Sequence, residues 1–381
     1  MWPGADLDER SDNQETRFLS AAFDDKATSY KLFWFRALLE VLKRRWDTES
    51  CGPIPVSELL GEMLTAAWHP VCLFRLSLGT TDRLQTACES LRTLSGLAPA
   101  DKARKVRAFI TSNPETLENL GNLVTYVPAL FLTPWFATEM RGIAAGTDRV
   151  KRATQLAFER RGQPAAPLYW LDGKGKSLSL QIDKKWEQFL RKNIGLLDAF
   201  ADHHLCDYLQ ARNPSAPGII RKLRLPQNRQ LAHARSFWNH VRDVMKQAGR
   251  SEFFRDIYSG ERLETGFSID HFLPWSFVAH DQLWNLAPVS ANTNSRKSDS
   301  LPDVELYLPK LVALHLHALD AIRETPSFHD DYLSSFKENV STLIEGGETS
   351  LLAHYKTLMI PQTQLAVNQG FEADWRFSSE V

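Results

Sequence analysis

Apolar residues recur every three to four positions along most of the chain, which is the spacing of helices with one buried face. The first and clearest run lies between Ser29 and Trp46, with apolar side chains at Leu32, Phe33, Phe35, Leu38, Leu39 and Leu42. A second helix is predicted to begin at Ser57, with Glu58 in its first turn. The same period predicts helices near 81–95, 101–112, 115–125, 147–161, 184–209, 303–323 and 328–346. We therefore expect a mainly α fold.

Two segments depart from the helical period. Residues 125–136 are aromatic and apolar, but Pro128 and Pro134 interrupt them, so a packed turn region is predicted there. Residues 168–182 contain two β-prone runs around the turn sequence of residues 172–175, which predicts a hairpin. The Gly-Lys pair in that turn lacks the spacing of a phosphate-binding loop.

Changes in composition suggest where the domains begin and end. Residues 1–27 are polar and acidic, and we expect them to be a disordered lead-in. The stretch RNPSAPG at 212–218 is rich in proline and glycine and is the best candidate for a boundary. The predicted arrangement is a helical domain over 28–217, followed by a C-terminal domain over 218–381.

Charge and cysteine content narrow the class of protein. The 381 residues carry a net charge of −1, which excludes a strongly basic coat for nucleic acid. The four cysteines form no C-x-x-C pair, and free thiols suit a reducing cytoplasm. The sequence has no apolar run of the roughly 18 residues that span a bilayer. We expect a cytoplasmic protein without a membrane partner.

Positive charge is nevertheless concentrated between residues 221 and 250, where Asp243 stands among many basic side chains. Two interpretations remain open: a solvated helix face, or a surface that contacts DNA phosphates. In the second interpretation the first contacts would be Arg221, Lys222 and Arg224.

The segment most informative about chemistry is residues 267–302. A short β-prone run over 267–269 leads into Asp270 and His271, and a proline-containing loop follows. The apolar run 283–286 is predicted to be the returning strand, and Ser290 is a suitable N-cap for a helix that ends before Pro302. Strand, loop, strand and helix would bring Asp270, His271 and Asn294 around one phosphate.

These side chains suit the hydrolysis of a phosphodiester bond. The reaction needs an activated water and a countercharge for the transition state. A histidine near its ordinary pKa can take a proton from water at neutral pH. Carboxylate and amide oxygens, such as those of Asp270 and Asn294, are ligands that Mg²⁺ prefers.

The spacing resembles that of the HNH (ββα-metal) endonucleases, and most closely the HNH domain of RNA-guided CRISPR effector nucleases. This resemblance implies a small ββα-metal module with its core at 257–302, embedded in further helices. It implies Mg²⁺ as the metal ion, with Mn²⁺ or another divalent ion as an alternative. It implies DNA as the substrate, expected to be double-stranded, with RNA as an alternative. By this resemblance His271 is the general base, and Asp270 and Asn294 are the metal ligands. Asn285 is the asparagine that orients the histidine. Arg296 and Lys297 would contact phosphate, with bracing of the motif as an alternative for Lys297.

The sequence also departs from the family pattern. Many members have histidine where Asn294 stands, and the cysteine pairs of the zinc-containing members are missing, with residues 257–260 where the first pair would fall. No structural zinc is therefore expected, and packing must replace it. His280 and Asn292 are expected to be bystanders. Asp281 and Asp299 could support the site residues, but surface or capping roles are favoured for both. The proposed packing residues are Trp275, Phe277, Trp284 and Leu286.

The motif covers under a tenth of the chain, and the rest shows only a weak resemblance to bacterial proteins that end in an HNH domain, some of them in restriction or anti-phage systems. The helical region is either a docking module for protein partners or a structural support. Three functions remain open: a DNA-cutting nuclease, an inactive HNH module that binds DNA, and a nuclease triggered within a larger assembly.

Overall fold

The computed structural model describes residues 14–24, 28–48, 50–225, 231–264 and 266–378. The chain forms two compact units, which divide after Pro214. The connecting segment is shared: Ser215–Arg221 belongs to the second unit, and Lys222–Leu225 belongs to the first. Among the described helices, none combines the length and the apolar character that a membrane crossing requires.

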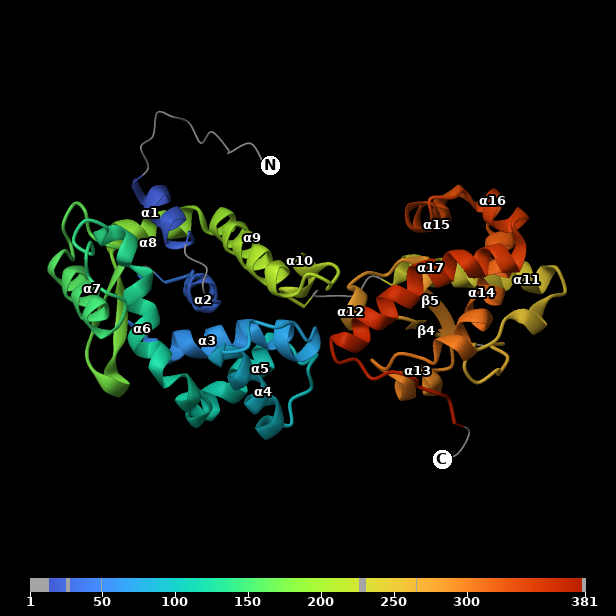
Figure 1. Ribbon diagram of the computed structural model, residues 1–381, viewed down its shortest axis with the longest axis horizontal. Helices are drawn as coiled ribbons and strands as arrows, with labels where there is room; N and C mark the ends of the chain where they lie inside the picture. Colours follow the sequence, from blue (N-terminus) through green and yellow to red (C-terminus); the bar gives the residue numbers. More distant parts are fainter. Residues whose placement is uncertain (1–13, 25–27, 49, 226–230, 265, 379–381) are drawn as a thin grey trace. The chain divides into compact units, whose positions relative to one another are not determined.

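The first unit is mainly helical, as the periodicity predicts (Figure 1). Its helix α2 buries every apolar side chain that the sequence pattern assigns to it. The helices of this unit are α1 (Gln14–Ala22), α2 (Tyr30–Arg44), α3 (Val56–Trp68), α4 (Arg83–Ser95), α5 (Ala103–Ser112), α6 (Gly121–Phe131), α7 (Thr147–Glu159), α8 (Lys184–Lys192) and α9 (Ile194–Arg212).

Two expectations for this unit need correction. Part of the predicted lead-in, Gln14–Ala22, is helix α1, because Leu19, Ala22 and Phe23 are buried and so hold it against the unit. Residues 1–13 lie outside the described part of the chain. The proline-rich stretch is also more regular than predicted, since helix α6 contains Pro128 and a short 3₁₀ helix follows at Thr133–Phe136.

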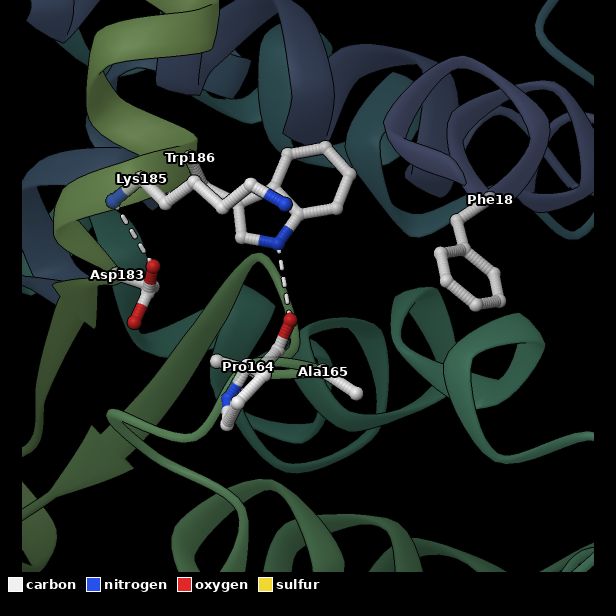
Figure 2. Close-up of a pocket in the computed structure, with 7 residues that line it drawn as sticks. Phe18, Pro164, Ala165, Asp183, Lys185 and Trp186 are labelled. Carbon is white, nitrogen blue, oxygen red and sulfur yellow. Dashed lines mark hydrogen bonds between the residues drawn. The ribbon is translucent and has the colours of Figure 1, made fainter. Parts of the chain in front are cut away.

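The predicted hairpin is confirmed as strands β2 (Tyr169–Asp172) and β3 (Ser179–Ile182), which pair antiparallel. A two-residue strand, β1 (Ile54–Pro55), adds to the other side of β3. Beside this sheet, the indole Nε1 of Trp186 donates a hydrogen bond to the carbonyl of Ala166, at 3.0 Å (Figure 2). The cavity there is about 20 Å³, room for about one water, so it is a packing defect and no ligand site.

The second unit surrounds a small hairpin with helices (Figure 1). Helix α14 packs against both α11 and α17, and α13 packs against β4. Its elements are α11 (Ala232–Gln247), β4 (Ser268–His271), α12 (Trp275–Val278), β5 (Leu286–Val289), α13 (Ala291–Lys297), α14 (Val304–Ala321), α15 (Asp330–Phe336), α16 (Val340–Glu345) and α17 (Gly347–Asn368). The short helix α10 (Ile219–Lys222) lies in the connecting segment.

One boundary in this unit differs from the prediction. Residues 283–285 form a 3₁₀ turn, and the returning strand begins only at Leu286. The cause is the side chain and backbone of Asn285, which bond to the loop after β4 and hold the chain out of the strand.

His315 ties the helices to this hairpin. Its imidazole is fully buried, with Nε2 3.0 Å from the carbonyl oxygen of Leu286 and Nδ1 2.7 Å from the hydroxyl of Tyr332. Burial lowers the pKa of His315 to about 3, so the ring is neutral at pH 7. A neutral ring satisfies both partners by donating from Nε2 to Leu286 and accepting at Nδ1 from Tyr332.

Candidate active site

Strands β4 and β5 and helix α13 carry the residues of the predicted motif. The strands pair antiparallel, with Asp270 opposite Ala287 and His271 opposite Leu286. Asp270 and His271 are 3% and 6% exposed, so both polar side chains lie in the protein interior and need partners there.

The carboxylate of Asp270 has two such partners. Its Oδ2 accepts a hydrogen bond from the Tyr258 hydroxyl at 2.8 Å, and its Oδ1 lies 3.2 Å from the ammonium of Lys297. Burial raises the pKa of Asp270, and the positive charge of Lys297 opposes that rise. The Lys297 ammonium also donates to the carbonyl of His271 at 2.7 Å. Lys297 is fully buried, and its two contacts tie helix α13 to the end of β4.

The imidazole of His271 bonds to a residue on the far side of the loop. Its Nε2 lies 2.8 Å from Oδ1 of Asp281, a carboxylate that can only accept, so Nε2 carries the hydrogen. His280 is the neighbour of Asp281, and burial lowers the pKa of its imidazole to about 4. His280 is therefore neutral at pH 7.

Asn285 closes the loop that follows His271. Its amide donates to the carbonyl of Leu273 and accepts from the Leu273 amide, each at 2.9 Å. The carbonyl of Asn285 also accepts from the amide of Phe272 at 2.8 Å. Asn285 is fully buried, and these bonds give both ends of its amide a partner in the loop.

Helix α13 begins where the sequence predicts. The Ser290 hydroxyl caps it by accepting from the amide of Thr293 at 3.1 Å. Asn294 is half-buried and precedes Lys297 by three residues, so the two share a face of the helix, the face from which Lys297 reaches Asp270. Arg296 is exposed and donates to the Ser378 hydroxyl at 2.9 Å.

The four packing residues proposed in place of a zinc knuckle, Trp275, Phe277, Trp284 and Leu286, are all buried.

A carboxylate that the motif does not include stabilises the same region through hydrogen bonds. Asp256 is fully buried, and its oxygens accept from the amides of Tyr258 at 2.9 Å and Ser290 at 2.9 Å. Asp256 thus fixes the turn that carries Tyr258 and joins it to the start of α13. Sequence reasoning missed Asp256 and Tyr258 because neither lies within the spaced motif.

The three basic residues proposed at the start of the C-terminal domain have different surroundings. Arg221 is exposed in the second unit, with Nη1 3.5 Å from the carbonyl of Ala279. Lys222 is fully buried in the first unit, and burial lowers its pKa to about 7. Arg224 pairs with Asp198 at 2.8 Å and with Asp202 at 3.0 Å. Of this trio, Arg221 is exposed, Lys222 is buried, and Arg224 is partly exposed but paired with two carboxylates.

Comparison with known proteins bears on this second unit. The family model described as HNH endonuclease matches residues 256–303, the segment that holds Tyr258, both strands and helix α13. No curated protein and no solved structure gives a significant match to the chain. The match covers this segment alone, and the closer likeness to CRISPR effector nucleases remains a prediction. Residues 256–303 form an HNH-family domain within a mainly helical chain.

Proposed function

We propose that the chain is a metal-dependent endonuclease that hydrolyses phosphodiester bonds in DNA through the site at the end of β4. The observation that carries this proposal is the joint placement of Asp270 and His271 beneath helix α13, with Lys297 joining the helix to both residues. HNH-family membership of residues 256–303 supports nucleic acid as the substrate.

His271 is the general base of the proposed reaction. Its Nε2 is bonded to Asp281, which leaves Nδ1 as the nitrogen with a free lone pair. Nδ1 takes a proton from water, the water oxygen bonds to phosphorus, and the bond to the leaving oxygen breaks. The leaving oxygen takes its proton from solvent, so the charge and proton balance closes.

Asp270 and Asn294 are the residues that would hold a divalent ion. They fit Mg²⁺ because both offer oxygen donors, and Mg²⁺ keeps several waters beside one or two protein ligands. The described residues contain no cluster of three or more His, Cys, Asp and Glu side chains able to hold a metal, so a closed all-protein cage does not apply. A bound ion would supply positive charge to the phosphate, and Mn²⁺ would serve the same purpose.

Other residues hold the site or its substrate. Asn285 keeps the loop after β4 closed and so fixes the position of His271. Arg221 and Arg296 are exposed cations that can meet the DNA backbone, whereas buried Lys222 and paired Arg224 are better assigned to the stability of the first unit. A nuclease joined to a helical unit suits restriction or anti-phage defence, with the helical unit binding a protein partner.

Plasmid nicking tests the proposal. Supercoiled DNA with Mg²⁺ or Mn²⁺ should relax to the nicked form, and EDTA should prevent this. Replacing the base, His271→Ala, should lower the nicking rate by about 100-fold or more while DNA binding persists. The matched control is His203→Ala, which changes an exposed histidine in the first unit and should cut like the parent.

Two outcomes would count against the proposal. Equal nicking by His271→Ala and the parent would remove His271 from the reaction. A parent that binds DNA but never cuts it, with either ion, would favour the inactive or partner-triggered module instead.

A further inference from the structure

The bond between His271 and Asp281 joins two parts of the second unit that are ten residues apart. His271 ends strand β4, whereas Asp281 lies in the loop between helix α12 and strand β5. The imidazole is 6% exposed, so little water competes with Asp281 for Nε2. A short bond of 2.8 Å to a charged acceptor is among the stronger hydrogen bonds of proteins.

We propose that Asp281 is a positioning residue for His271: its carboxylate fixes the ring orientation and the tautomer that leaves Nδ1 unprotonated. The inference rests on the proposed function, in which His271 is the base. It gives Asp281 a specific partner, where the sequence favoured a surface or capping role.

The loop around Asp281 is itself held in place. Ala279 ends helix α12 in the left-handed region, at φ 55°, and so turns the chain toward Asp281. Beyond it, the amide of Leu283 donates to Oδ2 of Asp331 on helix α15 at 2.9 Å. The side-chain oxygen of Gln282 accepts from the indole of Trp284, also at 2.9 Å. Asp281 therefore projects from a loop that is fixed on both sides.

The carboxylate of Asp281 is bonded to His271 on one side and reached by water on the other. Its side chain is 28% exposed and lines a cavity of about 540 Å³, so water reaches it. Arg221 and His280 line the same cavity, and Arg221 contributes a positive charge. Asp331 also lines it, but its carboxylate is bonded to the loop backbone. The oxygen that faces His271 is thus committed to the buried ring, while the rest of the side chain meets the cavity.

Nuclear magnetic resonance of metal-free protein with ¹⁵N-labelled histidine tests the tautomer directly. The His271 signals are identified by their loss in His271→Gln. At alkaline pH, where imidazoles are neutral, the parent should show His271 protonated at Nε2 alone. Asp281→Asn should populate the form protonated at Nδ1, because an amide can donate to Nε2 as well as accept from it. An unchanged tautomer in this variant would overturn the proposal.

Nicking kinetics supply the second measurement. Asp281→Asn and Asp281→Ala should lower kcat by about 10- to 100-fold with little change in KM, since Asp281 acts on the base and not on DNA affinity. Asp243→Asn, an exposed acid on helix α11, is the control and should retain parental kcat. Parental kcat in both Asp281 variants would overturn the role of Asp281 even if the tautomer shifts. A parent that cuts no DNA would refute the proposed function alone, because the tautomer measurement needs no activity.

Discussion

Lys297 and Asp270 form a pair of charges inside the second unit, with the ammonium fully buried and the carboxylate 3% exposed. Neither charge is stable there without the other, because burial penalises each of them. The ammonium also bonds to the His271 carbonyl, so one side chain fixes the backbone and the carboxylate at the end of β4. The stability of the second unit and the geometry of the site thus both depend on the ammonium nitrogen of Lys297.

Removing the cation should therefore be costly. Lys297→Met keeps much of the side-chain volume but leaves the Asp270 carboxylate without its charge partner. We expect the free energy of unfolding of the second unit to fall by about 3 kcal/mol, measured by urea denaturation. Lys310→Met, at an exposed position on helix α14, should change it by less than about 0.5 kcal/mol.

The background of Asp270→Asn separates the charge effect from packing. Because that background has no buried carboxylate to lose its charge partner, Lys297→Met should lower the free energy of unfolding clearly less there than in the parent. Equal costs in the two backgrounds would show that the ammonium acts mainly through the His271 carbonyl.

Sequence spacing singled out Asp270, His271, Asn285, Asn294 and Lys297, because a motif of fixed spacing on strand, loop and helix is visible in a single chain. Tyr258 was not identifiable in this way, and for Asp281 the sequence favoured a surface or capping role over support of the site. Tyr258 meets Asp270 through a turn set by the buried carboxylate of Asp256, and Asp281 meets His271 through a loop fixed by Asp331. Such contacts depend on tertiary packing, which residue order does not reveal.

At the level of elements, helix α14 supports the hairpin through His315, whose two nitrogens bond to Leu286 and Tyr332. The bond to Leu286 reaches the first residue of strand β5, directly opposite His271 in the register. The neutral ring is therefore part of the frame that holds the site.

This arrangement predicts a loss of stability in acid. The folded pKa of His315 is about 3, whereas an unfolded histidine has a pKa of about 6.5. Below about pH 6.5 the unfolded chain binds a proton at His315 that the folded chain does not bind. The contribution of His315 to the free energy of unfolding is therefore complete above that pH and falls as the pH drops toward 3. The slope should be about 1.4 kcal/mol per pH unit, measured as the free energy of unfolding across a pH series.

A substitution isolates this contribution from the other histidines. Glutamine at this position cannot titrate. Between about pH 6.5 and pH 4, the free energy of unfolding of the parent should therefore change with pH more steeply than that of His315→Gln, by the equivalent of about one bound proton. His203→Gln, at an exposed site, should leave the slope unchanged. Parallel slopes for parent and His315→Gln would contradict the assignment of a neutral buried ring.

Helices with a clear period were predictable, and so was the β2–β3 hairpin, because turn chemistry and alternation are local. The failures have a different origin. Helix α1 lies in a polar segment, and the burial of Leu19, Ala22 and Phe23 holds it against the first unit. Helix α6 contains Pro128, which is itself buried. In both places tertiary burial outweighs the local preference.

For the whole molecule, the two units have cores of their own. Leu38 on helix α2 and Leu311 on helix α14 are each fully buried, one in each unit, and the second unit's core runs from α11 to α17 without residues of the first. Chains with separate cores commonly unfold in more than one step. We therefore expect two transitions when the full chain is unfolded by heat in a calorimeter.

Core substitutions should assign each transition to its unit. Leu38→Ala and Leu311→Ala each remove buried methyl groups and should cost about 2 to 5 kcal/mol in the unit concerned. Leu38→Ala should lower the midpoint of one transition and leave the other in place, and Leu311→Ala should do the reverse. The transition that Leu311→Ala moves should also be the one that moves in Lys297→Met, because both residues lie in the second unit. If both leucine variants lower both midpoints equally, the units unfold as one, and a defect in the helical region would then also reduce the stability of the candidate site.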